Sequence, residues 1–335
     1  MLWPVLLELA SKTKLSDIHI HSDCEIAYRE FGEIVQLDHV VSESDINSFL
    51  KEMLPTKELQ LFQETKDADF AVEQDDYRFR VNAFYDSNKP ALILRKVETK
   101  VPSFEDLDLP PYIRGIPALE TGLVLVTGPT GSGKSTTLAA ILDVINTTTK
   151  GHIITIEDPV EFQHKSKSCV VTQREVGKDT RSFTNALRAS LREDPDVILV
   201  GELRDLETIQ LALTAAETGH LVFGTLHTNS APSTVTMIID VFPPEQQGQV
   251  TSQLAQTLRC VITQRLLKTI DKPGRVAAFE LMICNTAIQS LIRENKIYQI
   301  QNTMQMGKAE GQMLMENSIK ELIAAKRIDP ATSEK

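Results

Sequence analysis

The stretch GPTGSGKSTT (residues 128–137) directly follows the apolar run GLVLVT (122–127). It fits the pattern G-x-x-x-x-G-K-[ST], which joins a strand to a helix in nucleotide-binding proteins. Glycines let the backbone turn its N–H groups inward around a phosphate, and the N-terminus of the next helix adds partial positive charge. The sequence therefore predicts a nucleoside triphosphate site. We expect nine consecutive residues to form it: Gly128, Pro129, Thr130, Gly131, Ser132, Gly133, Lys134, Ser135 and Thr136.

Three side chains are candidates for chemistry at this site. Lys134 can reach the β- and γ-phosphates, and the Ser135 hydroxyl can bind Mg²⁺. Glu202 ends the apolar run DVILVGE (196–202), where enzymes with such a loop place a second acidic motif. The usual aspartate position holds Gly201, so we expect Glu202 to meet the metal through a water molecule.

A second acidic stretch, ITIEDPVEF (154–162), carries Glu157, Asp158 and Glu161 just past another predicted strand. The carboxyl ends of parallel strands are where such sheets bind ligands. Any of the three carboxylates could orient or deprotonate an attacking water molecule, and the residues alone do not choose among them.

Two histidines, His220 and His227, flank the apolar run LVFGTL (221–226). Each is more often a polar residue at a strand end than a catalytic one. Their spacing alone therefore assigns them no role.

The chain divides by pattern into three parts. Residues 1–98 mix alternating strands with amphipathic helices, which is typical of an α+β domain. Residues 99–120 hold four prolines and no long periodic segment, which predicts a linker. Residues 121–335 alternate apolar strands with helices, which predicts an α/β domain with a parallel sheet buried on both faces. Beyond about residue 244 the pattern predicts a mostly helical tail.

Composition narrows the classes of function. The chain has 335 residues and a net charge of −11, so we expect no direct nucleic-acid partner. Its four cysteines are far apart and form no CxxC pair, which gives no zinc site. No apolar run approaches the roughly 18 residues needed to span a bilayer. The start, MLWPVLLELASKTK, indicates an amphipathic helix rather than a signal peptide, so a cytoplasmic location is expected.

The order of several segments resembles the GspE/PilT superfamily of secretion ATPases and, within it, the retraction ATPases of type IV pili. The segments are TGPTGSGKSTT, ITIEDPVEF, VTQREV, LREDPDVILVGELRDLET and LTAAETGHLVFGTLHTNSA. The resemblance runs from SDIHIH (16–21) to AIQSLIRE (287–294) and is densest across 122–245. It implies an N-terminal PAS-like domain, a C-terminal RecA-like ATPase domain and a hexameric ring. The activity implied is hydrolysis of ATP with Mg²⁺, coupled to pilus retraction.

The resemblance also implies roles for single residues. Glu161 falls on the family's catalytic glutamate and Glu202 on its Walker B glutamate. His220 and His227 match the family's His box, which contributes to nucleotide binding. Arginines of the N-terminal domain help to contact nucleotide, and the matching residues are Arg80 in RFRVNAF and Arg95 in LILRKV.

Partners and location follow from the same resemblance. It implies a homo-hexamer that acts on a platform protein of the inner membrane, beside a possible second retraction ATPase. The protein would then be cytoplasmic and peripheral to that membrane through the pilus machine.

One motif departs from the family. The retraction ATPases carry AIR near the C-terminus, and residues 287–289 here read AIQ, so Gln289 stands at the arginine position. Four alternatives stay open: an accessory retraction ATPase, an extension or type II secretion ATPase, a nucleotide-dependent assembly protein with little turnover, and a nucleic-acid translocase. The lack of clustered cysteines disfavours the second, and the acidic balance disfavours the last.

Overall fold

The computed structural model describes residues 2–12, 15–30, 33–75, 77–97, 100–270 and 274–331. The chain forms two compact units, Met1–Lys100 and Val101–Lys335. The domain boundary predicted between residues 98 and 99 lies outside the described residues. Both units combine helices with a sheet, so the α/β fold class predicted from the sequence is confirmed.

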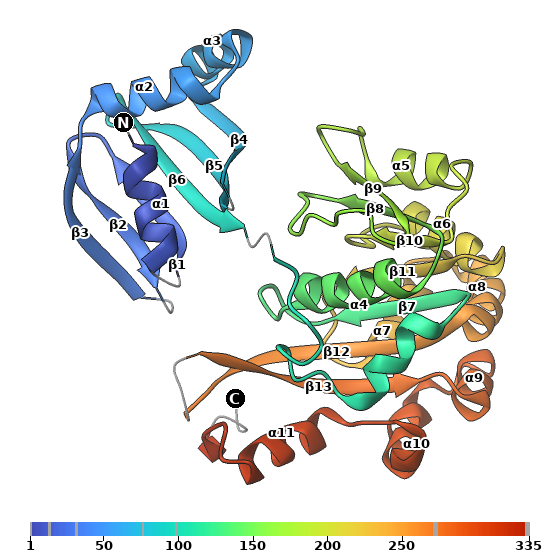
Figure 1. Ribbon diagram of the computed structural model, residues 1–335. Helices are drawn as coiled ribbons and strands as arrows, with labels where there is room; N and C mark the ends of the chain where they lie inside the picture. Colours follow the sequence, from blue (N-terminus) through green and yellow to red (C-terminus); the bar gives the residue numbers. More distant parts are fainter. Residues whose placement is uncertain are drawn as a thin grey trace. The chain divides into compact units, whose positions relative to one another are not determined.

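The first unit is built on an antiparallel sheet of six strands in the order β3-β2-β1-β6-β5-β4 (Figure 1). Its elements are α1 (Trp3–Lys12), β1 (Leu15–His21), β2 (Cys24–Glu30), β3 (Glu33–Val41), α2 (Glu43–Met53), α3 (Thr56–Thr65), β4 (Asp67–Gln74), β5 (Tyr77–Asp86) and β6 (Lys89–Val97). Alternation along β1 buries Ile18 and Ile20 in the core and leaves Asp17 on the other face. The Trp3 ring of α1 packs on this core, 5.7 Å from the ring of Phe49 in α2. Helices therefore cover one face of the sheet, and the other face is free for polar side chains.

Local signals explain most of the first unit. Helix α2 is one of the amphipathic helices predicted within residues 1–98, and it begins at a capping box in which Ser42 and Asp45 exchange hydrogen bonds. Helix α3 was not predicted, because it follows α2 almost at once and has Phe62 as its one buried side chain.

The second unit holds a sheet of seven strands in the order β13-β12-β7-β11-β10-β8-β9 (Figure 1). Its strands are β7 (Gly122–Thr127), β8 (His152–Glu157), β9 (Val170–Glu175), β10 (Val197–Val200), β11 (Leu221–Leu226), β12 (Leu258–Lys268) and β13 (Arg275–Ile283). Its α-helices are α4 (Lys134–Thr148), α5 (Phe183–Ser190), α6 (Leu206–Glu217), α7 (Ala231–Asp240), α8 (Pro244–Thr257), α9 (Thr286–Arg293), α10 (Ile300–Met306) and α11 (Met315–Ala324). All neighbouring strands are parallel except β12 and β13, which are antiparallel. The parallel sheet predicted from alternating strands and helices is therefore present.

Both faces of this sheet are buried. In β7, Leu123 and Leu125 join a core that includes α5, α6 and α7, while Val124 and Val126 join a second core with α4. Such double burial explains why the strands read as continuous apolar runs.

The mostly helical tail predicted beyond residue 244 is wrong for one segment. Strands β12 and β13 occupy this part of the chain and extend the sheet beside β7. The run CVIT within β12 is buried on both faces, and a short apolar run of this kind cannot be told from a buried helix by its periodicity. The correction bears on the nucleotide site, because β12 lies directly alongside the strand that leads into the glycine loop.

Residues of the predicted linker pack on the second unit. They include a 3₁₀ helix, η1 (Pro111–Ala118), whose Ile113 and Ile116 are buried in the same core as α4. None of the helices within the described ranges has an apolar stretch long enough to cross a bilayer.

Candidate nucleotide site

The glycine loop connects β7 to α4, as predicted. Gly128 has φ +138° and Gly133 has φ +89°, values that strongly favour glycine. The loop is also tightly enclosed by β12. A Cβ on Gly128 would lie 2.3 Å from the Gln264 carbonyl oxygen, and a Cβ on Gly133 would lie 2.8 Å from Gln264 Nε2. Gly128 is therefore required both by its conformation and by the approach of the β12 backbone, whereas Gly133 is required by its conformation and lies against the Gln264 side chain.

Lys134 lies in the concavity of the loop. Its Nζ donates hydrogen bonds to the carbonyl oxygens of Gly128 at 2.9 Å and of Pro129 at 3.2 Å. Burial lowers the pKa of Lys134, while the carboxylates of Glu202 and Glu161 act on that pKa in the opposite direction. Both carboxylates are thus close enough to interact with the lysine. Lys134, Glu202 and Glu161, to which the resemblance to the family assigns catalytic roles, therefore interact electrostatically in this structure.

Glu202 follows β10 and is held by two basic side chains. Its Oε2 lies 2.7 Å from Nη2 of Arg204, and its Oε1 lies 3.3 Å from Nε2 of His227. Thr225 of β11 donates a hydrogen bond to the Gly201 carbonyl and so joins the ends of the two strands. Arg204 was missed in the sequence, where its one signal is a basic residue two positions after the carboxylate.

The acidic stretch after β8 separates its carboxylates by environment. Glu157 accepts hydrogen bonds from Thr155 Oγ1 at 2.7 Å and from Gln173 Nε2 at 3.2 Å. Burial raises the pKa of Glu157, and the backbone N–H of Glu161 acts to lower it. Glu161 itself is exposed, as is Asp158. Glu157 is therefore occupied by hydrogen bonds within this segment, whereas Glu161 is exposed and interacts electrostatically with Lys134.

The two histidines lie at opposite ends of β11. Strand pairing sets Leu221 beside Gly122 and Leu226 beside Thr127, so His227 follows the edge that carries the glycine loop. His220 precedes the strand, roughly 20 Å away at about 3.3 Å per residue. Its Nδ1 lies 2.9 Å from the Ala215 carbonyl oxygen. Within this chain, the structure does not bring His220 to the predicted nucleotide site.

Arg80 and Arg95 belong to the first unit. They lie directly opposite each other on β5 and β6, and both are exposed. Arg95 Nε lies 2.9 Å from Asp17 Oδ1, and Arg80 Nε lies 4.0 Å from Asp69 Oδ1. The two arginines thus face each other across neighbouring strands, and each has a carboxylate of an adjacent strand as its partner.

The metal-binding prediction can be tested against the donor atoms. Mg²⁺ is usually bound by one or two protein ligands together with substrate phosphates and water. Among the described residues no group of three His, Cys, Asp or Glu side chains could hold a metal by itself. Ser135 lines a cavity of about 30 Å³ together with Gly201, the neighbour of Glu202. One hydroxyl and one carboxylate at this edge fit a magnesium ion bound mainly by phosphates.

Glu280 of β13 holds the segment that follows His227 by a hydrogen bond. This buried carboxylate accepts a hydrogen bond at 2.7 Å from the N–H of Ala231, the first residue of α7. Burial raises the pKa of Glu280, and the backbone N–H groups of Ala231 and Met315 act to lower it. Met315 is the first residue of α11, so one carboxylate interacts with the N-termini of two helices.

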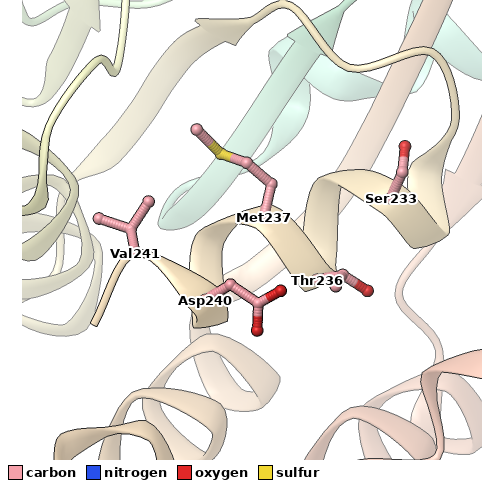
Figure 2. A pocket seen from close by; sticks show the side chains of 5 residues that line it. All are labelled: Ser233, Thr236, Met237, Asp240 and Val241. Atoms are coloured by element: carbon pink, nitrogen blue, oxygen red, sulfur yellow. The ribbon is translucent and has the colours of Figure 1, made fainter. Parts of the chain in front are cut away.

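A separate depression of about 530 Å³ lies on α7. Figure 2 shows its lining along one side of that helix: Ser233, Thr236, Met237, Asp240 and Val241. None of these residues was predicted to contact nucleotide.

Comparison with known proteins identifies the family of this chain. The family model described as Type II/IV secretion system protein matches residues 2–329. The Type IV pilus retractation ATPase PilT of Pseudomonas aeruginosa is 46% identical over 321 residues, which cover 95% of this chain and 93% of that protein. A twitching motility protein of Neisseria gonorrhoeae is 50% identical over 291 residues, covering 87% of this chain and 78% of its own length.

A solved structure agrees with these relatives. The crystal structure of the pilus retraction motor PilT with bound ADP superposes with a TM-score of 0.90 at 45% identity, covering 98% of this chain and 94% of that one. Because the family model spans nearly the whole sequence, the chain belongs to the Type II/IV secretion system protein family.

Proposed function

We propose that this protein is an ATPase motor that hydrolyses ATP to drive retraction of type IV pili. The observation that carries the proposal is the gathering of Lys134, Glu161, Glu202 and His227 at the sheet edge beside the glycine loop. Two relatives that match most of the chain are named for pilus retraction and for twitching motility. They support retraction, rather than extension, as the process that the ATPase drives.

Hydrolysis needs one water molecule aligned with the γ-phosphate. Glu161 accepts a proton from that water as its oxygen attacks phosphorus, and the bond to the β–γ bridging oxygen breaks to give ADP and phosphate. Lys134 stabilises the charge that builds on the phosphate oxygens. Ser135 and, through a water molecule, Glu202 would hold Mg²⁺, which would supply positive charge beside the phosphates. His227 and Arg204 hold the Glu202 carboxylate in one orientation at the strand end.

Movement requires a contact that differs between ATP and ADP. Arg80 and Arg95 of the first unit are an exposed cationic pair suited to a phosphate. Loss of the γ-phosphate removes part of their binding energy, so the preferred arrangement of the domains changes with hydrolysis. We propose that this happens in a homo-hexameric ring, in which successive changes act on a platform protein of the inner membrane. A second retraction ATPase is a possible partner, and the ring would be cytoplasmic and peripheral to the membrane.

The departure at Gln289 concerns coupling rather than hydrolysis. Gln289 lies in the first turns of α9, and its Nε2 donates a hydrogen bond to the Cys284 carbonyl at 3.3 Å. The neighbouring Ile288 is buried, so the helix packs normally. The change removes one positive charge and leaves the nucleotide site untouched.

The test is deletion of the gene, with counts of surface pili and scores for twitching, followed by complementation. We expect extra pili and lost motility, restored by wild type and not by Glu202→Ala. Cells without pili would indicate an extension or secretion ATPase instead. Retained twitching would indicate an accessory role, and full rescue by Glu202→Ala would indicate an assembly protein with little turnover.

A further inference from the structure

Strand β12 supports the glycine loop through one side chain that no sequence motif indicated. We propose that Gln264 is a positioning residue for nucleotide binding, because its amide and carbonyl together fix the loop between Gly128 and Thr137. The inference rests on the proposed role of this loop in binding ATP.

Pairing of strands places Gln264 under the loop. Thr263 of β12 is paired with Thr127, the last residue of β7, and their hydroxyl oxygens lie 2.9 Å apart. Gln264, the next residue, therefore runs alongside Gly128, where the strand becomes the loop. Its side chain is only 3% exposed.

The two ends of the side-chain amide serve different parts of the loop. Oε1 accepts a hydrogen bond at 2.9 Å from the hydroxyl of Thr137, which is buried in α4. Nε2 lies 2.8 Å from the position that a Cβ would occupy on Gly133. The amide thus spans the end of the loop and the start of the helix.

The main chain of the same residue meets the beginning of the loop. The Gln264 carbonyl oxygen lies 2.3 Å from the position of a Cβ on Gly128. One residue of β12 therefore touches the first glycine, the last glycine and the helix that follows. Between these points the Ser132 hydroxyl is buried without a hydrogen-bond partner in the described structure, so this side chain does not fix the loop, and Gln264 acts beside Lys134, which bonds to the Gly128 and Pro129 carbonyls.

This arrangement has a consequence for affinity. A loop that binds phosphate with its N–H groups binds best when those groups already converge, since ordering them on binding costs affinity. A buried amide that bonds to Thr137 and packs on Gly133 preserves that order. It must also be neutral, because a carboxylate in this place would repel the phosphates.

The experiment compares Gln264→Leu with Gln312→Leu in the full chain. Gln312 is a matched control, since it is also 3% exposed and its amide bonds to the N–H and the carbonyl of Ile283 at 2.9 and 2.7 Å. Binding of a fluorescent ADP analogue, the KM and kcat for ATP, and the Tm are measured for each. We expect similar losses of Tm, with ADP affinity weakened about tenfold and KM for ATP raised about tenfold only in Gln264→Leu. Equal nucleotide affinities in the two variants would overturn the proposal.

Two further variants make the result independent of general destabilisation. Thr137→Val removes the donor to Oε1 without changing the shape of the side chain, and its loss of affinity should not add to that of Gln264→Leu. Gln264→Glu keeps the acceptor and adds a charge, so it should bind ADP more weakly than Gln264→Leu. Additive losses together with unimpaired binding by Gln264→Glu would refute the assigned role. Wild-type protein that binds no nucleotide would instead refute the proposed function.

Discussion

The two sheets present their charged side chains in different ways. In the second unit both faces of the sheet are buried, and Lys134, Glu202 and His227 lie where strands end or helices begin. In the first unit one face is open, and Arg80 and Arg95 stand on it in the middle of their strands. A doubly covered parallel sheet leaves polar groups only its ends, whereas a sheet covered on one side can display a charged face. The location of a functional residue therefore follows from the type of sheet that carries it.

The largest effect on ATP hydrolysis should come from removing the charged side chains that lie at the strand ends beside the glycine loop. We expect Lys134→Ala and Glu202→Ala to lower the rate of phosphate release by about 1,000-fold, because each removes charge stabilisation near the phosphates. Lys150→Ala and Glu245→Ala change exposed residues of the same unit and should leave the rate unchanged. Normal turnover in Glu202→Ala would show that the chemistry lies elsewhere.

Two glycines of the same loop should differ in how much their replacement by alanine lowers the free energy of unfolding. Gly128→Ala should lower the free energy of unfolding by about 3 kcal/mol, since its Cβ would meet the Gln264 carbonyl oxygen. Gly131 also has positive φ, +74°, but a Cβ there has nothing within 4 Å, so Gly131→Ala should cost only about 1 kcal/mol. Urea unfolding measures both, and equal losses would mean that β12 does not press on the loop.

Replacing the two histidines in turn compares the effect on ATP turnover of side chains at the two ends of β11. We expect His227→Ala to reduce ATP turnover about 30-fold, because Glu202 loses one of the groups that orient it. His220→Ala should change turnover less than about threefold, since that side chain bonds to Ala215 at the opposite edge. A larger effect of His220→Ala on the ATPase rate would require that it act on a site other than that of its own chain.

Substitution of an arginine on the open face of the first unit should reduce turnover less than His227→Ala does. Arg80→Ala is expected to reduce the ATPase rate about tenfold, through loss of a phosphate contact. Removing one of two facing like charges should leave thermal stability unchanged or slightly higher. Lys89→Ala, which breaks an exposed ion pair with Asp23 on the same sheet, is the control and should keep full activity. An unchanged rate in Arg80→Ala would remove this face from the mechanism.

These comparisons also show what the sequence could predict. The glycine loop, Glu202 and the strands that carry them were predictable, because the motif and the apolar runs are local signals. His220 and His227 look equivalent in the sequence and are separated only by the direction of β11. Strands β12 and β13 were missed because a short buried run has no distinctive period, and the place of Gln264 under the loop was missed with them. Contacts that depend on the order of strands in the sheet cannot be predicted from a local sequence pattern.

Glu280 connects the C-terminal helix α11 with α7, the helix that follows His227. Its carboxylate, buried in β13, interacts with the N-termini of α7 and α11. If α11 moved away, the carboxylate would lose a donor that favours its charge and would depend more heavily on α7, the helix that follows His227. The buried carboxylate thus links the N-terminus of the C-terminal helix α11 to the N-terminus of α7, two segments that lie more than 80 residues apart in the sequence.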